Sequence, residues 1–410
     1  AMQGTDRDGP YFHVLFQFQL FGLNGAFLTG DLFNLFVFFE VLLIASYGLL
    51  LHGGGAARTR AGLHYVVINL VGSTLFLFAI GTLYGILGTL NMADLAERVA
   101  VLPPEHTGVV AAAGLLLFVV FGLKAALLPL HLWLPAAYAN TSAPVAALFA
   151  IMTKVGAYAI LRVYSLIFGP GQGELAGLID PWLLPLGLLT VVVAVLGIMA
   201  SQRLAQQVAF LVLASAGTLL SAFGLSSPEA VAAGLYYLAH STFAAAGLFL
   251  LADLLARQRG ELGDALVAGP ALGQVNLLGG LFLLLALAVA GIPPLSGFLG
   301  KVMILEASMG TPWMAWMLAV ILITGLFTIM SLAQSGSRLF YKVDEGRAAV
   351  AGHTAGLELA PLVGLLVLVV LLVLFAGPVH DFSLATAGQL FDSAPYREAV
   401  LSAVPESPLP

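Results

Sequence analysis

The sequence predicts an all-α polytopic membrane protein with about eleven transmembrane helices, and three observations lead to this fold class. Hydrophobic residues make up 60% of the chain and charged residues only 9%, with a mean hydropathy of +1.02. Apolar runs of about 20 residues, long enough to cross a bilayer, recur along the chain. The chain has no cysteine, which excludes disulfide frameworks and iron–sulfur clusters held by its own thiolates.

Charges, glycines and prolines divide the chain into helices. The expected helices span 11–29, 31–51, 61–88, 108–128, 144–168, 182–200, 204–225, 229–257, 272–309, 313–340 and 361–378. Segment 129–143 is predicted to be a break or interfacial turn, and 381–410 a short exposed extension.

Basic residues are distributed unevenly between the two sides of the expected bundle. Nine lie in loops on the side of the N-terminus: Arg7, Arg58, Arg60, Arg203, Arg257, Arg259, Arg338, Lys342 and Arg347. Three lie on the other side: Arg98, Arg162 and Arg397. Cytoplasmic loops carry the excess of Lys and Arg in membrane proteins. We therefore expect a multi-pass protein of the cell membrane, with the N-terminus cytoplasmic and the C-terminus outside.

The first ten expected helices form two groups of five. Lys124 falls on the fourth helix of the first group and Lys301 on the fourth of the second, each beside prolines. A five-helix unit crosses the membrane an odd number of times, so its successor is inverted, and matched broken helices in inverted repeats mark ion sites in transporters. The predicted domains are a first repeat at 1–168 broken at 129–143, a second at 182–340 broken near 291–300, and a last helix with a short tail at 341–410.

Five ionisable side chains lie inside the expected spans: Glu40, Lys124, Lys154, His240 and Lys301. A charge at bilayer depth costs about 3 kcal/mol on insertion scales, so such residues usually line an ion or proton path. A simpler reading exists for each, because lysines extend to the interface and a buried Glu or His can be a hydrogen-bonded packing group. Five in one chain favour a path. Four other candidates fall near expected interfaces, where solvation or local pairing is expected: His64, His131, Glu306 and Asp253.

Four segments carry a resemblance to a known family. They are FQFQLFGLNGAFLTGDLFNLFVFFEVLLIASYGLLLHG, GLKAALLPLHLWLPAAYANTSAPVAALFAIMTKVGAYAILRVY, YYLAHSTFAAAGLFLLADLLARQRG and AGIPPLSGFLGK. They resemble the antiporter-like proton-translocating family shared by complex I and Mrp cation/proton antiporters, and above all the D-type component of Mrp (also Pha or Mnh) complexes. The resemblance covers nearly the whole chain. Because that family has fourteen helices, three of them before this segment, the chain is expected to be shortened at its N-terminus.

The resemblance implies a role for each of the five residues. In the family, a helix-centred Glu, a Lys on a broken helix, a Lys or His on the next helix, a connecting His, and a Lys or Glu on the second broken helix form a hydrophilic axis. These positions correspond to Glu40, Lys124, Lys154, His240 and Lys301. A contact between Glu40 and Lys124 that forms and breaks would switch whether Lys124 keeps its proton. Protonation is therefore expected to pass along the axis.

The expected function is that of a membrane subunit in a multisubunit Na⁺/H⁺, or monovalent cation/proton, antiporter, and not of an enzyme. Expected partners are other Mrp subunits, the lipid bilayer, protons and monovalent cations, Na⁺ first. No cofactor or metal is expected, and no nucleic acid, because the net charge of −6 forms no basic patch. The alternatives are a proton-pumping subunit of an NADH:quinone oxidoreductase (complex I) or membrane hydrogenase, and a structural scaffold without ion flux.

Overall fold

The structure, a computed structural model, describes residues 4–344 and 356–402, and helices dominate this part of the chain. Its α-helices are α1 (Phe12–Leu28), α2 (Leu32–Leu51), α3 (Ala56–Leu87), α4 (Met92–Ala100), α5 (Pro104–Lys124), α6 (Trp133–Asn140), α7 (Ala143–Phe149), α8 (Met152–Leu166), α9 (Asp180–Ala200), α10 (Leu204–Phe223), α11 (Pro228–Arg259), α12 (Val275–Ala290), α13 (Ser296–Ala307), α14 (Met314–Gly336), α15 (Gly356–Leu374), α16 (Ala376–Phe391) and α17 (Ala394–Ser402). Short helices are η1 (Thr5–Arg7), η2 (Gly173–Leu175), η3 (Gly260–Leu262) and the π-helical η4 (Ser337–Tyr341).

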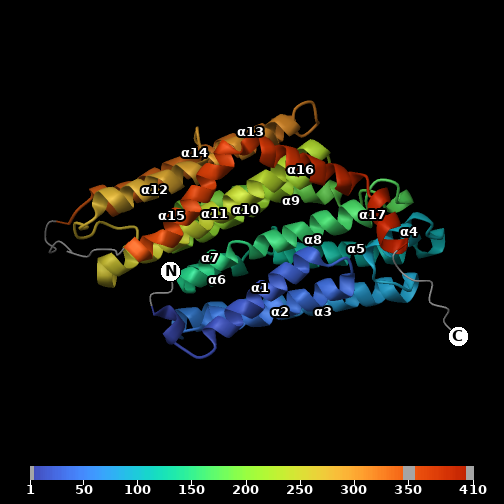
Figure 1. Cartoon of the computed structure of the whole chain (residues 1–410), viewed down its shortest axis with the longest axis horizontal. Helices are drawn as coiled ribbons and strands as arrows, with labels where there is room; N and C mark the ends of the chain where they lie inside the picture. Colours follow the sequence, from blue (N-terminus) through green and yellow to red (C-terminus); the bar gives the residue numbers. More distant parts are fainter. Residues whose placement is uncertain (1–3, 345–355, 403–410) are drawn as a thin grey trace.

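The spans expected from the sequence are present. Among the described residues, nine helical segments are long and apolar enough to cross a membrane, and two shorter apolar helices, α1 and α12, accompany them. They lie side by side along the long axis of the molecule (Figure 1). Caps fix several of their starts: the side chain of Asp31 accepts a hydrogen bond from the backbone N–H of Asn34 at the start of α2, and Ser227 does the same for α11.

The expected basic loops gather at one end of the bundle, which we call the basic end; the N-terminus lies there as well (Figure 1). Arg58 donates to the carbonyl of Asn140 (2.9 Å), and Arg203 donates to the side chains of Asn140 (3.2 Å) and Asp264 (2.8 Å). Eight of the nine basic residues expected together belong to its loops and helix ends: Arg7, Arg58, Arg60, Arg203, Arg257, Arg259, Arg338 and Lys342. Arg347 lies outside the described residues. Helices α4 and α17 lie at the opposite end.

This arrangement makes a direct prediction about labelling. Single cysteines at Ala57 and Glu261, in exposed positions of the basic end, should react with an impermeant thiol reagent from one side of the membrane only. A cysteine at Glu229, exposed at the opposite end, should react only from the other side. Because the chain has no native cysteine, each signal comes from the introduced residue. Labelling of Ala57 and Glu229 positions from the same side would contradict the arrangement of the spans.

Three parts of the fold differ from the sequence prediction. The helix expected at 144–168 is divided into α7 and α8 by a turn at residues 150–151. The polar stretch after α3 folds into helix α4. The side chain of Asn91 caps the start of this helix. The extension expected to be exposed at 381–410 begins inside helix α16, which continues to Phe391. This helix packs against α11 and buries Ser383 and Ala387. Residues 403–410 of that extension lie outside the described residues.

The element order repeats itself. The first group consists of α1, α2, α3, α5 with α6, and α7 with α8; the second consists of α9, α10, α11, α12 with α13, and α14. The fourth member of each group is interrupted, at residues 125–132 and at residues 291–295. Helix α1 starts at the basic end and α9 at the opposite end, so corresponding helices run in opposite directions (Figure 1).

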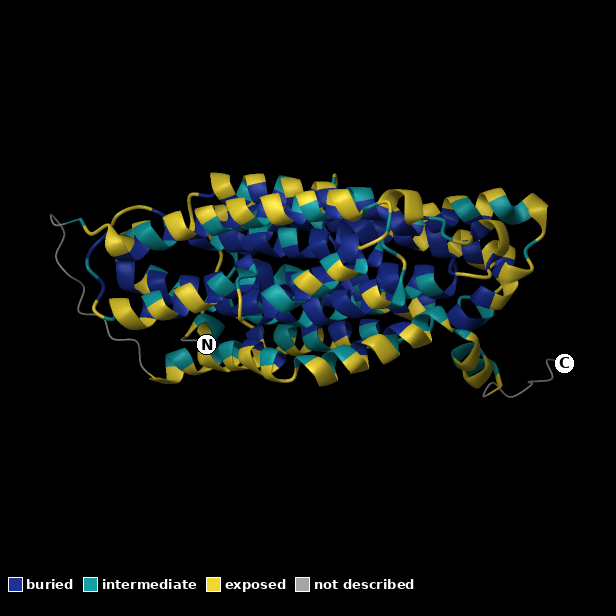
Figure 2. Ribbon diagram, turned by 90° about the horizontal axis from the view of Figure 1, so that it is seen from above, coloured by how far each residue is buried: buried dark blue, intermediate teal, exposed yellow. Residues whose placement is uncertain are grey.

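Burial separates a lipid-facing surface from the interior. Exposed residues line the outer helix faces, and buried residues fill the space between helices (Figure 2). Large apolar side chains such as Phe78, Leu196 and Trp316 are more than half exposed, as expected for faces that meet acyl chains. The interior also holds the buried polar and charged side chains, which in a bilayer must find partners within the protein.

Candidate functional site

Each of the three intramembrane lysines lies beside an interruption of its helix. Lys124 is the last residue of α5, and the next helix begins only at Trp133. Lys154 is the third residue of α8, directly after the turn at 150–151, and Lys301 is in the second turn of α13. A helix end leaves backbone carbonyls or N–H groups without helical partners. Irregular backbone at membrane depth is tolerated where protein or water satisfies such groups.

In the first group, helix α3 links Glu40 and Lys124. The hydroxyl of Ser73 donates to Oε1 of Glu40, and Nζ of Lys124 donates to Oδ1 (3.2 Å) and the carbonyl (3.5 Å) of Asn69. Asn69 and Ser73 are four residues apart and therefore share one face of α3. The sequence suggested a direct contact of Glu40 with Lys124. The described residues contain no ion pair between them, although the carboxylate is close enough to act electrostatically on the ammonium.

Lys154 lies at the junction of the two groups. Its side chain is 0% exposed, and Nζ donates to Oγ of Ser215 on α10 at 3.0 Å. On the same helix, Gly156 packs on the backbone of Lys124 and Ala125: a Cβ at this position would lie 2.5 Å from the amide nitrogen of Ala125. The absence of a side chain at Gly156 thus lets α8 approach the break after α5. This contact brings the first two lysine-bearing helices together.

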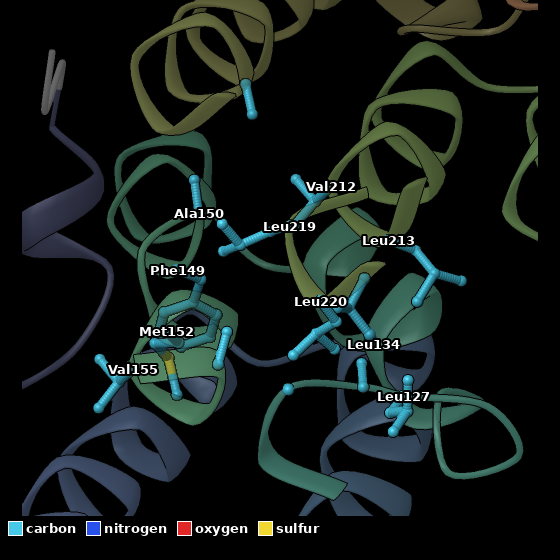
Figure 3. Packing of buried hydrophobic residues seen from close by; sticks show 14 of the residues in the cluster. Leu127, Leu134, Phe149, Ala150, Met152, Val155, Val212, Leu213, Leu219 and Leu220 are labelled. Atoms are coloured by element: carbon cyan, nitrogen blue, oxygen red, sulfur yellow. The ribbon is translucent and has the colours of Figure 1, made fainter. Parts of the chain in front are cut away.

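Apolar packing closes the junction around Lys154. Met152 and Val155, on either side of it in sequence, belong to a cluster with Leu134 of α6 and with Val212 and Leu219 of α10 (Figure 3). Such packing keeps water away from Lys154 on every side except that of its polar neighbour Ser215. In this low-dielectric setting, a single charge or proton exerts a strong effect on the next group.

In the second group, His240 and Lys301 occupy the region of the second break. His240 is 1% exposed, and its Nδ1 shares a hydrogen bond of 2.8 Å with Oγ of Ser296, the first residue of α13. Nζ of Lys301 donates to the carbonyl of Ala290 (2.8 Å), the last residue of α12. The ammonium thereby satisfies a carbonyl at a helix C-terminus, the end that favours positive charge.

A cavity of about 40 Å³ connects the centre of the chain to the second break. Its wall includes Ser215, the partner of Lys154, together with His240 and Lys301. Hydroxyl groups of Thr218, Ser241, Thr324 and Thr328 also line it. Since one water needs about 10–15 Å³ of such volume, the cavity has room for a few waters beside these polar groups. Lys154, His240 and Lys301 are therefore separated by polar or hydratable space.

The five expected residues lie on α2, α5, α8, α11 and α13, and the structure adds the side chains that hold four of them. These partners are Asn69, Ser73, Ser215 and Ser296. No hydrogen bond joins any two of the five residues directly in the described part of the chain. Glu40 and Lys301, the two ends of the expected axis, are half-buried, whereas the middle three are buried.

The four candidates set aside in the sequence take different positions. His64 and Glu306 are exposed, and Asp253 pairs with Arg257 at 2.8 Å. His131 differs, because it is buried within the break after α5 and its Nδ1 has no partner among the described residues. Its position near prolines suggested an interface, and nothing in the sequence indicated the depth of the break. No group of three metal-ligating side chains occurs in the described residues.

The close approach at Gly156 gives a prediction about stability. Gly156→Ala should lower the melting temperature of the protein and destabilise it by about 1–3 kcal/mol, because the methyl group meets backbone that cannot move aside. Gly81→Ala in α3 is the matched control, since nothing lies within 4 Å of its added Cβ. Thermal unfolding of the detergent-solubilised protein measures both. Equal stability of the two variants would show that α8 does not rest on the Lys124 backbone.

Known proteins share this sequence and fold. Residues 29–328 match the family described as NADH:quinone oxidoreductase/Mrp antiporter, transmembrane. A probable K⁺/H⁺ antiporter subunit (D type) of Rhizobium meliloti is 42% identical over 96% of this chain and 78% of its own length. An Na⁺/H⁺ antiporter subunit, also of D type, from Alkalihalophilus pseudofirmus is 39% identical over 97% of this chain and 79% of its own.

Solved structures agree with these relatives. A chain of the Mrp complex from Dietzia sp. superposes with a TM-score of 0.80 at 29% identity, covering 93% of this chain and 78% of the other. A chain of respiratory complex I from Thermus thermophilus superposes with a TM-score of 0.79 at 28% identity, covering 94% and 81%. The fold is thus shared by a chain of an Mrp complex and a chain of respiratory complex I.

Proposed function

Because this chain belongs to the NADH:quinone oxidoreductase/Mrp antiporter family, we propose that it is the proton-translocating membrane subunit of a monovalent cation/proton antiporter. One observation carries the proposal: five ionisable residues lie inside the bundle on α2, α5, α8, α11 and α13, and each is held by a hydroxyl, an amide or a helix-terminal carbonyl. Such groups accept and donate protons or hold a charge without water on every side. A scaffold has no need of them at this depth.

The two five-helix groups act as two halves of the path. Residues 1–168 and 182–340 form these halves, and the polar contact between Lys154 and Ser215 connects them. When Glu40 withdraws from Lys124, the buried ammonium loses the charge that favours it and releases its proton. The proton then moves toward Lys154, His240 and Lys301, whose titrations are coupled. The basic end faces the cytoplasm of the cell, as the excess of arginine in its loops favours.

Other subunits complete the axis at both of its ends. Glu40 and Lys301 are only half-buried in this chain. A partly exposed charge at this depth is costly against lipid, so a neighbouring protein surface is expected to cover each of them. The related chains are antiporter subunits, and one solved relative is part of an Mrp complex. Na⁺ is the first candidate for the exchanged cation and K⁺ the second, after the names of the two relatives.

A second candidate function is favoured by the likeness to complex I. In that case the same axis pumps protons while electron transfer in partner chains drives it, and the membrane complex is an NADH:quinone oxidoreductase or a hydrogenase. The axis itself serves both functions equally. What drives it distinguishes them.

Reconstitution distinguishes the two. The assembled complex containing this chain is placed in proteoliposomes with an internal pH indicator, and Na⁺, K⁺ or choline is added without any electron donor or quinone. Antiport predicts that Na⁺ or K⁺ moves protons and choline does not. A complex that moves protons only with a reductant and an electron acceptor would instead be a redox-driven pump.

A further inference from the structure

A hydrogen-bonded cluster lies between the central cavity and the basic end. Nε2 of Gln207 on α10 donates to Oγ of Ser331 on α14 at 2.8 Å. The Ser331 hydroxyl in turn donates to the carbonyl of Ile198 on α9 at 3.2 Å. Gln207 is only 1% exposed, and its Oε1 accepts no hydrogen bond within the described residues. We call these three residues the Gln207 cluster.

The cluster lies one helical turn from the cavity on all three helices. Val195, Leu211 and Thr328 line the cavity on α9, α10 and α14. Ile198, Gln207 and Ser331 are three or four residues away along the same helices, in each case toward the basic end. Residues at this spacing share a helix face. The cluster therefore continues the cavity wall, in the seam between the three helices.

Polar side chains continue through the seam on both sides of the cluster. Along α14, Thr324, Thr328, Ser331 and Ser335 recur at spacings of four, three and four residues, and all four are buried. The other side of α14 carries Leu326 and Met330, which are exposed as lipid-facing side chains are. Ser335 is in the last turn of α14 at the basic end. A single face of hydroxyl groups therefore leads from the last turn of α14 to the cavity that Lys301 and His240 line.

We propose that this seam is a water path by which protons reach the second five-helix group from the basic end, and that Gln207 and Ser331 form its gate. Two features support a gate over a packing contact. The unfilled acceptor Oε1 of Gln207 gives an entering water a partner that the protein does not provide. The Ser331 hydroxyl can donate to that water instead, while the Ile198 carbonyl keeps Nε2 of Gln207 as a donor at 3.5 Å. The water path rests on the proposed function in one respect only, namely that the ion carried is a proton.

Silver-ion protection tests the path independently of transport. Ser335→Cys, Ser331→Cys and Thr328→Cys are made singly in the chain within its assembled complex, and this chain has no native cysteine. Ag⁺ is applied to one side of sealed vesicles. Thiols that it reaches then fail to react with fluorescent maleimide after denaturation. Leu326→Cys and Met330→Cys, at similar depths on the lipid-facing side of α14, are the controls.

The expected result is protection of the three seam cysteines from the basic end only, with Ser335→Cys protected fastest and Thr328→Cys slowest, and no protection of the two controls. Protection from the opposite end alone, or no protection at any seam position, would overturn the path. Since Ag⁺ protection requires no exchange, a closed seam in an active antiporter would overturn only this inference. An open seam in a complex that exchanges no cations would overturn only the proposed function.

The gate is tested by Gln207→Leu, with Gln206→Leu as the neighbouring control. Without its amide, the cluster becomes apolar, so Thr328→Cys should lose its protection while Ser335→Cys, on the outer side, keeps it. Cation-driven proton exchange should fall about tenfold, because a water in the seam loses one hydrogen-bond partner, Oε1 of Gln207. Gln206 is half-exposed at the basic end, and its change should leave both measurements as they were. Unchanged protection of Thr328→Cys in Gln207→Leu would show that Gln207 gates nothing.

Discussion

Lys154→Met should reduce cation-driven proton exchange by about a hundredfold or more, the usual loss when a group that transfers a proton is removed. Lys154 is the fully buried ionisable group at the junction of the two five-helix groups, and its ammonium contacts Ser215 across that junction. Methionine keeps the length and flexibility of the side chain, so the surrounding apolar packing is preserved. Exchange is measured in proteoliposomes of the assembled complex, after equal assembly has been shown.

Two further variants give this prediction its meaning. Lys154→Arg keeps the positive charge, but a guanidinium does not release its proton in proteins. It should therefore be as inactive as Lys154→Met. Lys342→Met, in an exposed loop of the basic end, removes a charge without touching the axis and should exchange normally. Normal exchange in Lys154→Arg would show that the site needs only a fixed positive charge, and proton transfer through Lys154 would be wrong.

Glu40→Gln should have an effect of similar size for a different reason. Glutamine keeps the contact with Ser73 but removes the charge that acts on Lys124. Without that charge, the buried ammonium is uncompensated and gives up its proton, so the switch no longer operates. Glu40→Asp keeps the charge on a shorter side chain and should retain part of the activity with a shifted pH profile. Exchange is measured against pH for both variants.

A matched control comes from the same helix. Asn34→Asp adds a carboxylate at the exposed start of α2, beside the N-cap Asp31, and should leave exchange unchanged. Full activity of Glu40→Gln across the pH range would mean that Glu40 is a packing residue whose hydrogen bond to Ser73 is its whole role.

Much of the fold is predictable from the sequence because a bilayer constrains sequence strongly. Apolar length alone locates a span, and a charge within an apolar run stands out, so the sequence by itself singles out Lys124, Lys154 and Lys301. The turn at 150–151 carries no such signal, since FAIM at 149–152 contains neither glycine nor proline. Helix α16 escapes prediction because its sequence is less apolar than that of a span, although it packs on α11.

The partners of the five residues could not be predicted. Asn69, Ser73, Ser215 and Ser296 are small polar residues of a kind common in membrane helices, where a hydroxyl can satisfy itself on its own helix. Which of the many polar residues contacts one of the five ionisable side chains depends on how each helix is rotated and on which helices are neighbours. The described residues show no ion pair between Glu40 and Lys124; instead α3, which packs against both α2 and α5, supplies a polar partner to each of them.

The central claim is that Glu40 and Lys124 act as one unit at the start of a proton path. The most direct measurement is a double-mutant cycle of cation-driven proton exchange, in proteoliposomes of the assembled complex, with Glu40→Gln, Lys124→Met and the two changes combined. Groups that act as one unit give non-additive losses. The account predicts that the double variant is no less active than the less active of the two single variants. Losses that add independently in the double variant would contradict it, because each residue would then contribute to transport without the other.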